Sequence, residues 1–117
     1  MWTEEKQEHL NNIRNYSYYK EIAVKSFKWL AHNASSFEDW HEICQQIEPS
    51  NPLYRFVLNA MKGRALNFEH WHILRCYTPL EKSDLQSFAT HKMVSSISTS
   101  EQFEKTREYT LWPKNYL

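Results

Sequence analysis

Two pairs of histidine and cysteine side chains have the types and spacing to hold a metal ion. His41 and Cys44 are three residues apart and His72 and Cys76 are four apart, so each pair projects from one face of a helix. Two such helices side by side would offer two thiolates and two imidazoles in a tetrahedron, which suits zinc. The cysteines lack the close pairing of a standard zinc finger, and free cysteine is among the most buried residue types. We therefore expect no cofactor, and the four-residue zinc site is the alternative.

A second constellation is Arg64 followed, after five residues, by His70. This spacing resembles the Arg-x₄₋₆-His motif of HEPN-domain ribonucleases, which are small all-α proteins. The resemblance covers seven residues, with Ala65 where the family often has a polar residue. It implies metal-independent cleavage of RNA, in which His70 acts in acid–base catalysis and Arg64 steadies the phosphate. The simpler interpretation, which we favour, is a solvated arginine and a surface histidine in a protein that is not an enzyme.

Aromatic side chains are the third feature, and the one on which our functional prediction rests. The chain has five Trp, seven Tyr and six Phe, more than the core of a small helical protein needs. Tyr and Trp are favoured anchors of protein interfaces. We predict a non-enzymatic interaction module, such as an adaptor, inhibitor or accessory protein, that binds a protein partner or a second copy of itself. The residues expected to contact the partner are Tyr16, Tyr18, Trp29, Trp112 and Tyr116. The alternative is that these rings only shield helix ends.

The charge balance argues against a nucleic-acid partner. Fourteen basic residues face fourteen acidic ones, so the chain lacks the positive excess on which phosphate binding depends. Lys20, Lys25 and Lys28 lie near tyrosines and could contact phosphates and bases, which leaves nucleic acid as an alternative.

The longest apolar runs have three residues, so no membrane-spanning helix is expected. An N-terminus without an apolar signal segment and two cysteines that need no oxidising compartment indicate a cytoplasmic location.

Composition and helix signals predict an all-α fold, a compact bundle of five to six short helices in one domain over residues 1–117. A single glycine disfavours the tight turns of a many-stranded protein. Thr3 is predicted to cap a first helix that buries Leu10 and Ile13, and a second helix is predicted over about 17–33. The sequence leaves open whether these two helices are continuous. The predicted inward face of the second helix comprises Tyr19, Ile22, Ala23, Ser26, Trp29 and Leu30.

Capping signals place the remaining helices. Capping boxes are predicted at Ser35 with Glu38 for the third helix, at Thr78 with Glu81 for the sixth, and at Ser98 with Glu101 for the last. Asn51 and Pro52 are predicted to open the fourth helix, with Gly63 just beyond its end. Asn67 is predicted to cap a fifth helix over 68–77. The predicted inward face of the third helix comprises Phe37, Trp40, Ile43, Cys44 and Ile47, and Glu48 with Pro49 is predicted to end that helix. The predicted inward face of the fourth helix comprises Leu53, Phe56, Val57, Ala60 and Met61.

One short segment occurs twice. Phe-Glu-Asp-Trp-His at 37–41 matches Phe-Glu-His-Trp-His at 68–72, with an offset of 31 residues. A period in the thirties is typical of helix-pair repeats such as tetratricopeptide arrays. Only two copies occur, and the characteristic residues of such repeats are absent. We interpret both segments as first turns of helices, where glutamate favours the helix dipole and the aromatic rings one turn apart pack inward.

Overall fold

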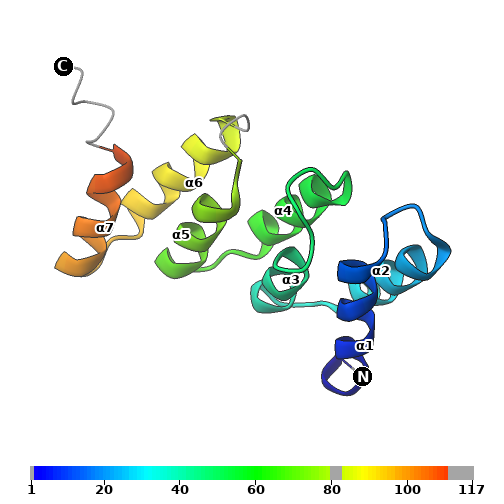
Figure 1. Cartoon of the computed structure of the whole chain (residues 1–117). Coiled ribbons are helices and arrows are strands. Elements are labelled where there is room, and N and C mark those ends of the chain that lie inside the picture. Colours follow the sequence, from blue (N-terminus) through cyan, green and yellow to red (C-terminus); the bar gives the residue numbers. More distant parts are fainter. Residues whose placement is uncertain (1, 80–82, 111–117) are drawn as a thin grey trace. The chain divides into compact units, whose positions relative to one another are not determined.

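Helices account for all the regular structure in the described part of the chain. The computed structural model describes residues 2–79 and 83–110, and within them the chain forms seven α-helices and no strand (Figure 1). In chain order the helices are α1 (Trp2–Asn15), α2 (Glu21–Asn33), α3 (Phe37–Cys44), α4 (Leu53–Arg64), α5 (Phe68–Tyr77), α6 (Ser83–Ser95) and α7 (Ser100–Thr110). The all-α prediction is confirmed. None of the described helices is long and apolar enough to cross a membrane.

The helix count is seven rather than five or six because the chain leaves the helix after Asn15. Residues 16–20 are Tyr, Ser, Tyr, Tyr and Lys, and Tyr and Ser are weaker helix formers than Arg14 before them and Glu21 after them. Lys20 is extended, with φ −73° and ψ 140°, and α2 begins at the next residue. The first two predicted helices are therefore separate, and the tyrosines between them lie in a loop.

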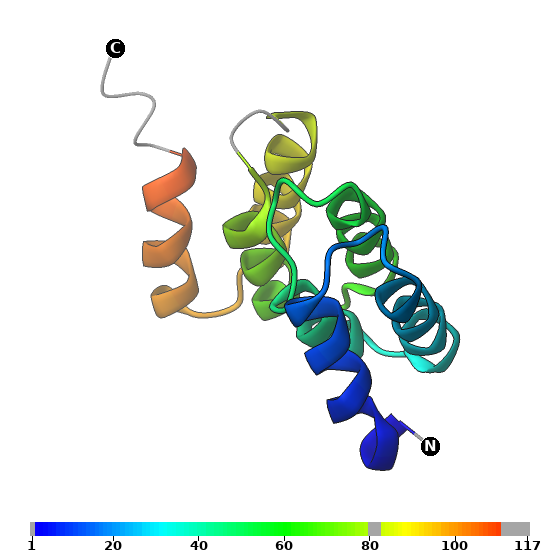
Figure 2. The ribbon, with the colours of Figure 1, turned by 45° about the vertical axis from the view of Figure 1, so that its right-hand side comes forward.

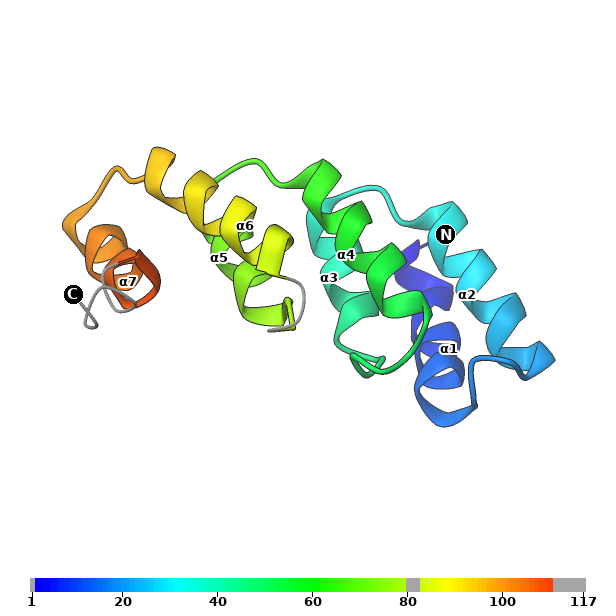
Figure 3. The ribbon, with the colours of Figure 1, turned by 90° about the horizontal axis from the view of Figure 1, so that it is seen from above.

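Each helix packs mainly on its neighbour in the chain. α1 pairs with α2, α3 with α4, α5 with α6, and α6 with α7. The chain divides into two compact units, Met1–Arg64 with α1 to α4, here called unit 1, and Ala65–Leu117 with α5 to α7, here called unit 2. Viewed from above, α3 and α4 lie side by side and run in opposite directions (Figure 3). In unit 2, α6 runs opposite to both α5 and α7 (Figure 2).

The second helices of successive pairs share one pattern of burial. Four residues of α2 are buried at a spacing of i, i+3, i+4 and i+7, and adding 31 to their numbers gives the four buried residues of α4. The two sets are Ala23, Ser26, Phe27 and Leu30 in α2, and Tyr54, Val57, Leu58 and Met61 in α4. In α6, Ala89 and Met93 lie 32 residues beyond Val57 and Met61, and all four of these are fully buried. The pairs α1–α2, α3–α4 and α5–α6 are thus three variants of one helix hairpin.

The sequence echo belongs to this repeat. Its two copies open α3 and α5, as predicted, and their side chains have the same surroundings. Phe37 lies 6.2 Å from the ring of His41, and Phe68 lies 6.1 Å from that of His72. The two tryptophans are buried, and each contacts a phenylalanine of the second helix of its own hairpin. These ring pairs are Trp40 with Phe56, at 5.9 Å, and Trp71 with Phe88, at 5.6 Å.

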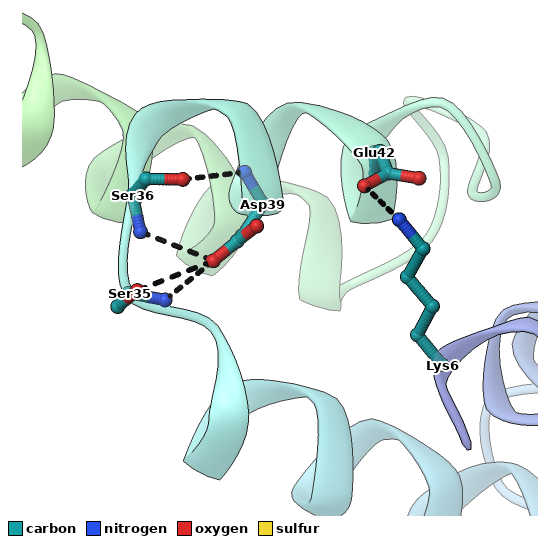
Figure 4. A network of polar contacts seen from close by, with 5 residues as sticks. All are labelled: Lys6, Ser35, Ser36, Asp39 and Glu42. Atoms are coloured by element: carbon teal, nitrogen blue, oxygen red, sulfur yellow. Dashed lines mark hydrogen bonds and ion pairs between the residues drawn. The ribbon is translucent and has the colours of Figure 1, made fainter. Parts of the chain in front are cut away.

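Two of the predicted capping boxes are displaced by one residue. For α3 the N-cap is Ser36, whose hydroxyl accepts from the Asp39 amide, while the Asp39 carboxylate accepts from the amides of Ser35 and Ser36 (Figure 4). The prediction of Ser35 with Glu38 was wrong because adjacent serines satisfy the same pattern. At α7 the Gln102 amide N–H is accepted by Thr99, not by the predicted Ser98.

Two further boundary predictions were wrong, and a third falls outside the described residues. Gly63 lies inside α4, and no residue in the described ranges has a positive φ, so this helix does not end on a left-handed glycine. Thr3 lies within α1, which already begins at Trp2. Thr78 ends α5, where its hydroxyl donates to the Leu74 carbonyl, and the predicted start of the sixth helix with Glu81 lies outside the described residues.

The predicted inward faces of α2 and α4 differ in part from the faces that are buried in the structure. Tyr19 and Ile22 are exposed, and Phe27 is buried in their place, because α2 begins only at Glu21 and turns this face toward α1. In α4 Phe56 is 56% exposed, whereas Tyr54 and Leu58, which were not predicted, are buried. The remaining predicted core residues of α1 and α3 are buried, namely Leu10, Ile13, Phe37, Trp40, Ile43, Cys44 and Ile47.

Candidate functional site

A groove in unit 1 lies where two loops meet. Its volume is about 470 Å³. The loops are the connection between α1 and α2 and the connection between α3 and α4, which lie at the same end of unit 1 in both views (Figures 1 and 3). The lining residues are Ile13, Arg14, Asn15, Tyr16, Ser17, Tyr18, Tyr19, Gln46, Ile47, Glu48, Ser50 and Asn51. We call this site the tyrosine groove.

Contacts among α1, α2 and α3 hold the two loops in place. The hydroxyl of Ser26 on α2 is buried and bonds to His9 Nδ1 and Asn12 Nδ2 of α1, each at 2.9 Å. Lys6 of α1 forms an ion pair of 2.8 Å with Glu42 of α3 (Figure 4). Both charged groups remain partly exposed, so this pair orients α1 more than it stabilises the fold.

Three tyrosines dominate the wall formed by the first loop. Tyr16 is 47% exposed, Tyr18 46% and Tyr19 69%. Their phenol groups make no hydrogen bond within residues 2–79 and 83–110, so they remain open to a ligand. The rings of Tyr18 and Tyr19 lie edge to face, with centroids 5.6 Å apart and planes at 86°. The ammonium group of Lys20 lies over the ring of Tyr19, 5.9 Å from its centroid.

The groove carries one basic and one acidic side chain. Arg14 donates from Nη2 to Asn11 Oδ1 at 2.7 Å, a bond along its own helix. Glu48 is exposed and takes part in no ion pair with any residue that the structure describes. Asn51, which also lines the groove, accepts from the Leu53 amide and so opens α4, as predicted.

The other predicted partner-binding residues do not line this groove. Trp29 of α2 is half-buried and stacks on His9, with ring centroids 4.5 Å apart, and on Trp2 at 6.3 Å. This stacking joins α1 to α2, which is a structural role. Trp112 and Tyr116 lie outside the described residues. The structure therefore brings two of the five predicted residues, Tyr16 and Tyr18, to one site.

The first half of the alternative metal site lies on α3. Cys44 is 1% exposed, and burial raises the pKa of its thiol to about 11, with a hydrogen bond to Tyr54 acting in the opposite direction. Burial lowers the pKa of His41, against the nearby carboxylates of Glu38 and Glu42, which raise it. A thiol with so high a pKa is protonated at neutral pH when no metal is bound, and a metal ion would have to displace this proton.

The second half of the alternative metal site lies on α5, in unit 2. His72 is half-buried against Phe68, and Cys76 is exposed. Among residues 2–79 and 83–110 there is no group of three or more His, Cys, Asp or Glu side chains that could hold a metal ion. The zinc site stays a sequence prediction that no described geometry supports.

Arg64 and His70 each make contacts that stabilise their own surroundings. Arg64 donates to the carbonyls of Ser35 and Ala60, and its guanidinium lies 5.4 Å from the ring centroid of Trp40. His70 is buried, and its Nδ1 accepts from the Leu66 amide at 3.0 Å. Neither side chain is the solvated surface group that the simpler interpretation assumed. These bonds close the turns that precede α3 and α5.

The sequence prediction missed two residues that the groove needs. Tyr19 was assigned to the buried face of a longer second helix. Glu48 was considered only as the residue before Pro49. The signal that could have found Tyr19 is its place in the tyrosine-rich break, because a run of weak helix formers predicts a loop. No local signal places Glu48 beside the tyrosines.

Comparison of the chain with protein-family models, curated proteins and solved structures finds no match.

Proposed function

We propose that the protein is a non-enzymatic interaction module whose tyrosine groove binds an extended segment of a protein partner. The observation that carries the proposal is the set of three exposed tyrosines that share one groove with serine and asparagine side chains from two loops. Tyr16 and Tyr18 are the expected anchors, and Tyr19 joins them.

The side-chain types of the groove favour protein recognition. A tyrosine ring offers a large, rigid contact surface and a polar tip, and it loses little conformational entropy when it binds. Neighbouring Ser17, Ser50 and Asn51 can adapt their hydrogen bonds to a peptide backbone. A volume of about 470 Å³ accommodates two or three side chains of an extended segment.

Charge supports a protein partner over a nucleic acid. Arg14 and Glu48 give the groove one charge of each sign, and the whole chain has no excess of basic residues. A site built for phosphates would need a net positive surface. Self-association through the same groove is the other form of this proposal, and it would appear as a dimer that dissociates when the tyrosines are replaced.

Peptide selection tests the proposal. A library of random twelve-residue peptides displayed on phage is panned on the full-length protein, and the selected peptides are titrated by fluorescence anisotropy. We expect binders that lose at least about ten-fold in affinity to the Tyr16→Ala/Tyr18→Ala double variant, because truncated interface anchors commonly cost more than 1 kcal/mol each.

Phe103→Ala is the matched control, because Phe103 is an aromatic residue of unit 2 that is 51% exposed and far from both loops in the sequence. Its replacement should leave peptide affinity unchanged. Sedimentation velocity of the wild type and the double variant separates a heterologous partner from self-association. The proposal is wrong if no peptide binds and the protein is monomeric at high micromolar concentration, or if the double variant binds as well as the wild type.

A further inference from the structure

Tyr18 and Tyr19 form an aromatic corner in the tyrosine groove. Their ring planes meet at 86° with centroids 5.6 Å apart, so one ring presents its edge to the face of the other. The face of an aromatic ring is electronegative and attracts a cation, and rings set at angles to one another are how aromatic cages hold alkylammonium groups. With Tyr16 on the same wall, this part of the groove is suited to a positively charged group.

A cation already occupies part of this corner. The ammonium of Lys20 lies over the Tyr19 ring at 5.9 Å from its centroid. Lys20 is exposed, makes no ion pair with another residue that the structure describes, and sits on a flexible stem. It can therefore leave the ring without breaking another bond when a ligand offers a better-placed cation.

One of the two charges that line the groove favours the same kind of ligand. Arg14 donates to the neutral side chain of Asn11 and keeps its positive charge, while the carboxylate of Glu48 has no basic partner in the described ranges. A cationic side chain on the tyrosines would bring the opposite charge to Glu48. An acidic ligand would be repelled by that carboxylate and by the electronegative ring faces, and only Arg14 and Lys20 would attract it.

We infer that the tyrosine groove recognises a lysine or arginine side chain of the partner segment. The rings of Tyr18 and Tyr19 hold this side chain, and the carboxylate of Glu48 compensates its positive charge. This inference rests on the proposed function, because it names the residue that the peptide-binding groove selects. It makes Tyr19 and Glu48 specificity-determining residues, beside the anchors Tyr16 and Tyr18.

Matched peptides and variants test the inference. Peptides selected as above are expected to share a Lys or Arg at one position, and each is compared with a synthetic copy that carries Gln there. The change to Gln should weaken binding to the wild type about ten-fold, as expected for a cation that loses both ring and carboxylate contacts. Glu48→Gln should weaken the basic peptide several-fold and leave the Gln peptide unchanged, whereas Arg14→Gln should not weaken either.

The affinity of Lys20→Gln for the basic peptide distinguishes a cation site on the tyrosine rings from a purely structural role of these rings. Removing the internal cation should raise affinity for the basic peptide about two- to five-fold, since the ring face is then vacant. Lys25→Gln is the matched control, because Lys25 lies in the first half of the helix that Lys20 precedes, has the same charge and pairs only loosely with Glu21 at 4.0 Å. It should leave the affinity unchanged.

The outcomes separate this inference from the proposed function. Peptides that need Tyr16 and Tyr18 but carry no basic residue, or that ignore Glu48→Gln, overturn the inference and leave the proposed function standing. Acidic peptides that lose binding in Arg14→Gln overturn it in the same way. If no peptide depends on the tyrosines, both ideas fail.

Discussion

The two cysteine side chains differ in their exposure to solvent. Cys44 is 1% exposed on α3, and Cys76 is exposed on α5. Burial raises the pKa of the Cys44 thiol from its ordinary value of 9.0 to about 11, because a thiolate is poorly stabilised away from water. Without a metal ion, Cys44 therefore behaves as a small apolar core group.

Thiol reactivity tests this difference. At pH 8 the native protein should react quickly with one equivalent of a thiol reagent, at Cys76, because Cys44 remains protonated and covered until the pH approaches 11. Cys76→Ser should abolish the fast reaction, and both thiols of the wild type should react in urea. Two fast thiols in the native protein, or protection of Cys44 that a chelator removes, would contradict the buried-core interpretation.

At the scale of single helices, the side chain at the third helical position decides where a helix begins. Two adjacent hydroxyl residues precede both α3 and α7, so the sequence pattern fits either of them as N-cap. In α3 the Asp39 carboxylate reaches back to the amides of Ser35 and Ser36, which leaves Ser36 in the capping position. Gln102 makes the equivalent bond to the Ser98 amide at the start of α7.

Ser36→Ala and Ser35→Ala should therefore differ. Ser36→Ala removes the acceptor of the Asp39 amide and should lower the free energy of unfolding by about 1 kcal/mol. Ser35→Ala removes only an exposed hydroxyl contact of 3.3 Å to the Asp39 carboxylate, so its effect should lie within about 0.5 kcal/mol. Urea denaturation of the two variants measures both values. A larger loss in Ser35→Ala would restore the cap that the sequence predicted.

At the scale of the whole molecule, the chain consists of successive helix hairpins with a common pattern of burial. Contacts fall mainly between helices that are neighbours in sequence, within unit 1 and within unit 2. In proteins built this way stability is close to a sum of local terms, and regions can open separately. Met61 and Met93 are equivalent positions of this pattern, 32 residues apart, and both are fully buried.

Substituting these two methionines should destabilise different units. Met61→Ala and Met93→Ala should each cost about 2 to 5 kcal/mol, because each leaves a cavity in a closed core. Hydrogen exchange followed by mass spectrometry should show the larger loss of protection in α1 to α4 for Met61→Ala and in α5 to α7 for Met93→Ala. An equal loss over all helices in both variants would indicate that the chain unfolds as one cooperative body.

Much of the secondary structure was predictable because its causes are local. The fifth helix was predicted over 68–77 with Asn67 as its cap, and the structure has both features. The buried residues of α1 and α3 follow from helical periodicity in the same way. Gly63 was misplaced because glycine past a helix end is only a tendency, and here the helix continues through it.

The candidate site was predicted only in part. Tyr16 and Tyr18 were expected at a binding surface from their residue type, and they line the tyrosine groove. Trp29 was expected there for the same reason, but the stacking of α2 on α1 uses it as a packing residue. Residue type indicates which side chains suit an interface, but the packing of neighbouring helices determines which of them remain uncovered.

The sequence by itself determined the all-helical class and most helix positions, because propensity, capping and periodicity act within a few residues, but it does not decide the break between α1 and α2. Only the tertiary structure decided that this break lies beside the loop that carries Glu48, some 30 residues further along the chain. That meeting depends on how α1 packs against α2 and α3, through Ser26 and the ion pair of Lys6 with Glu42. Such contacts join residues that no local pattern relates, and they created the groove.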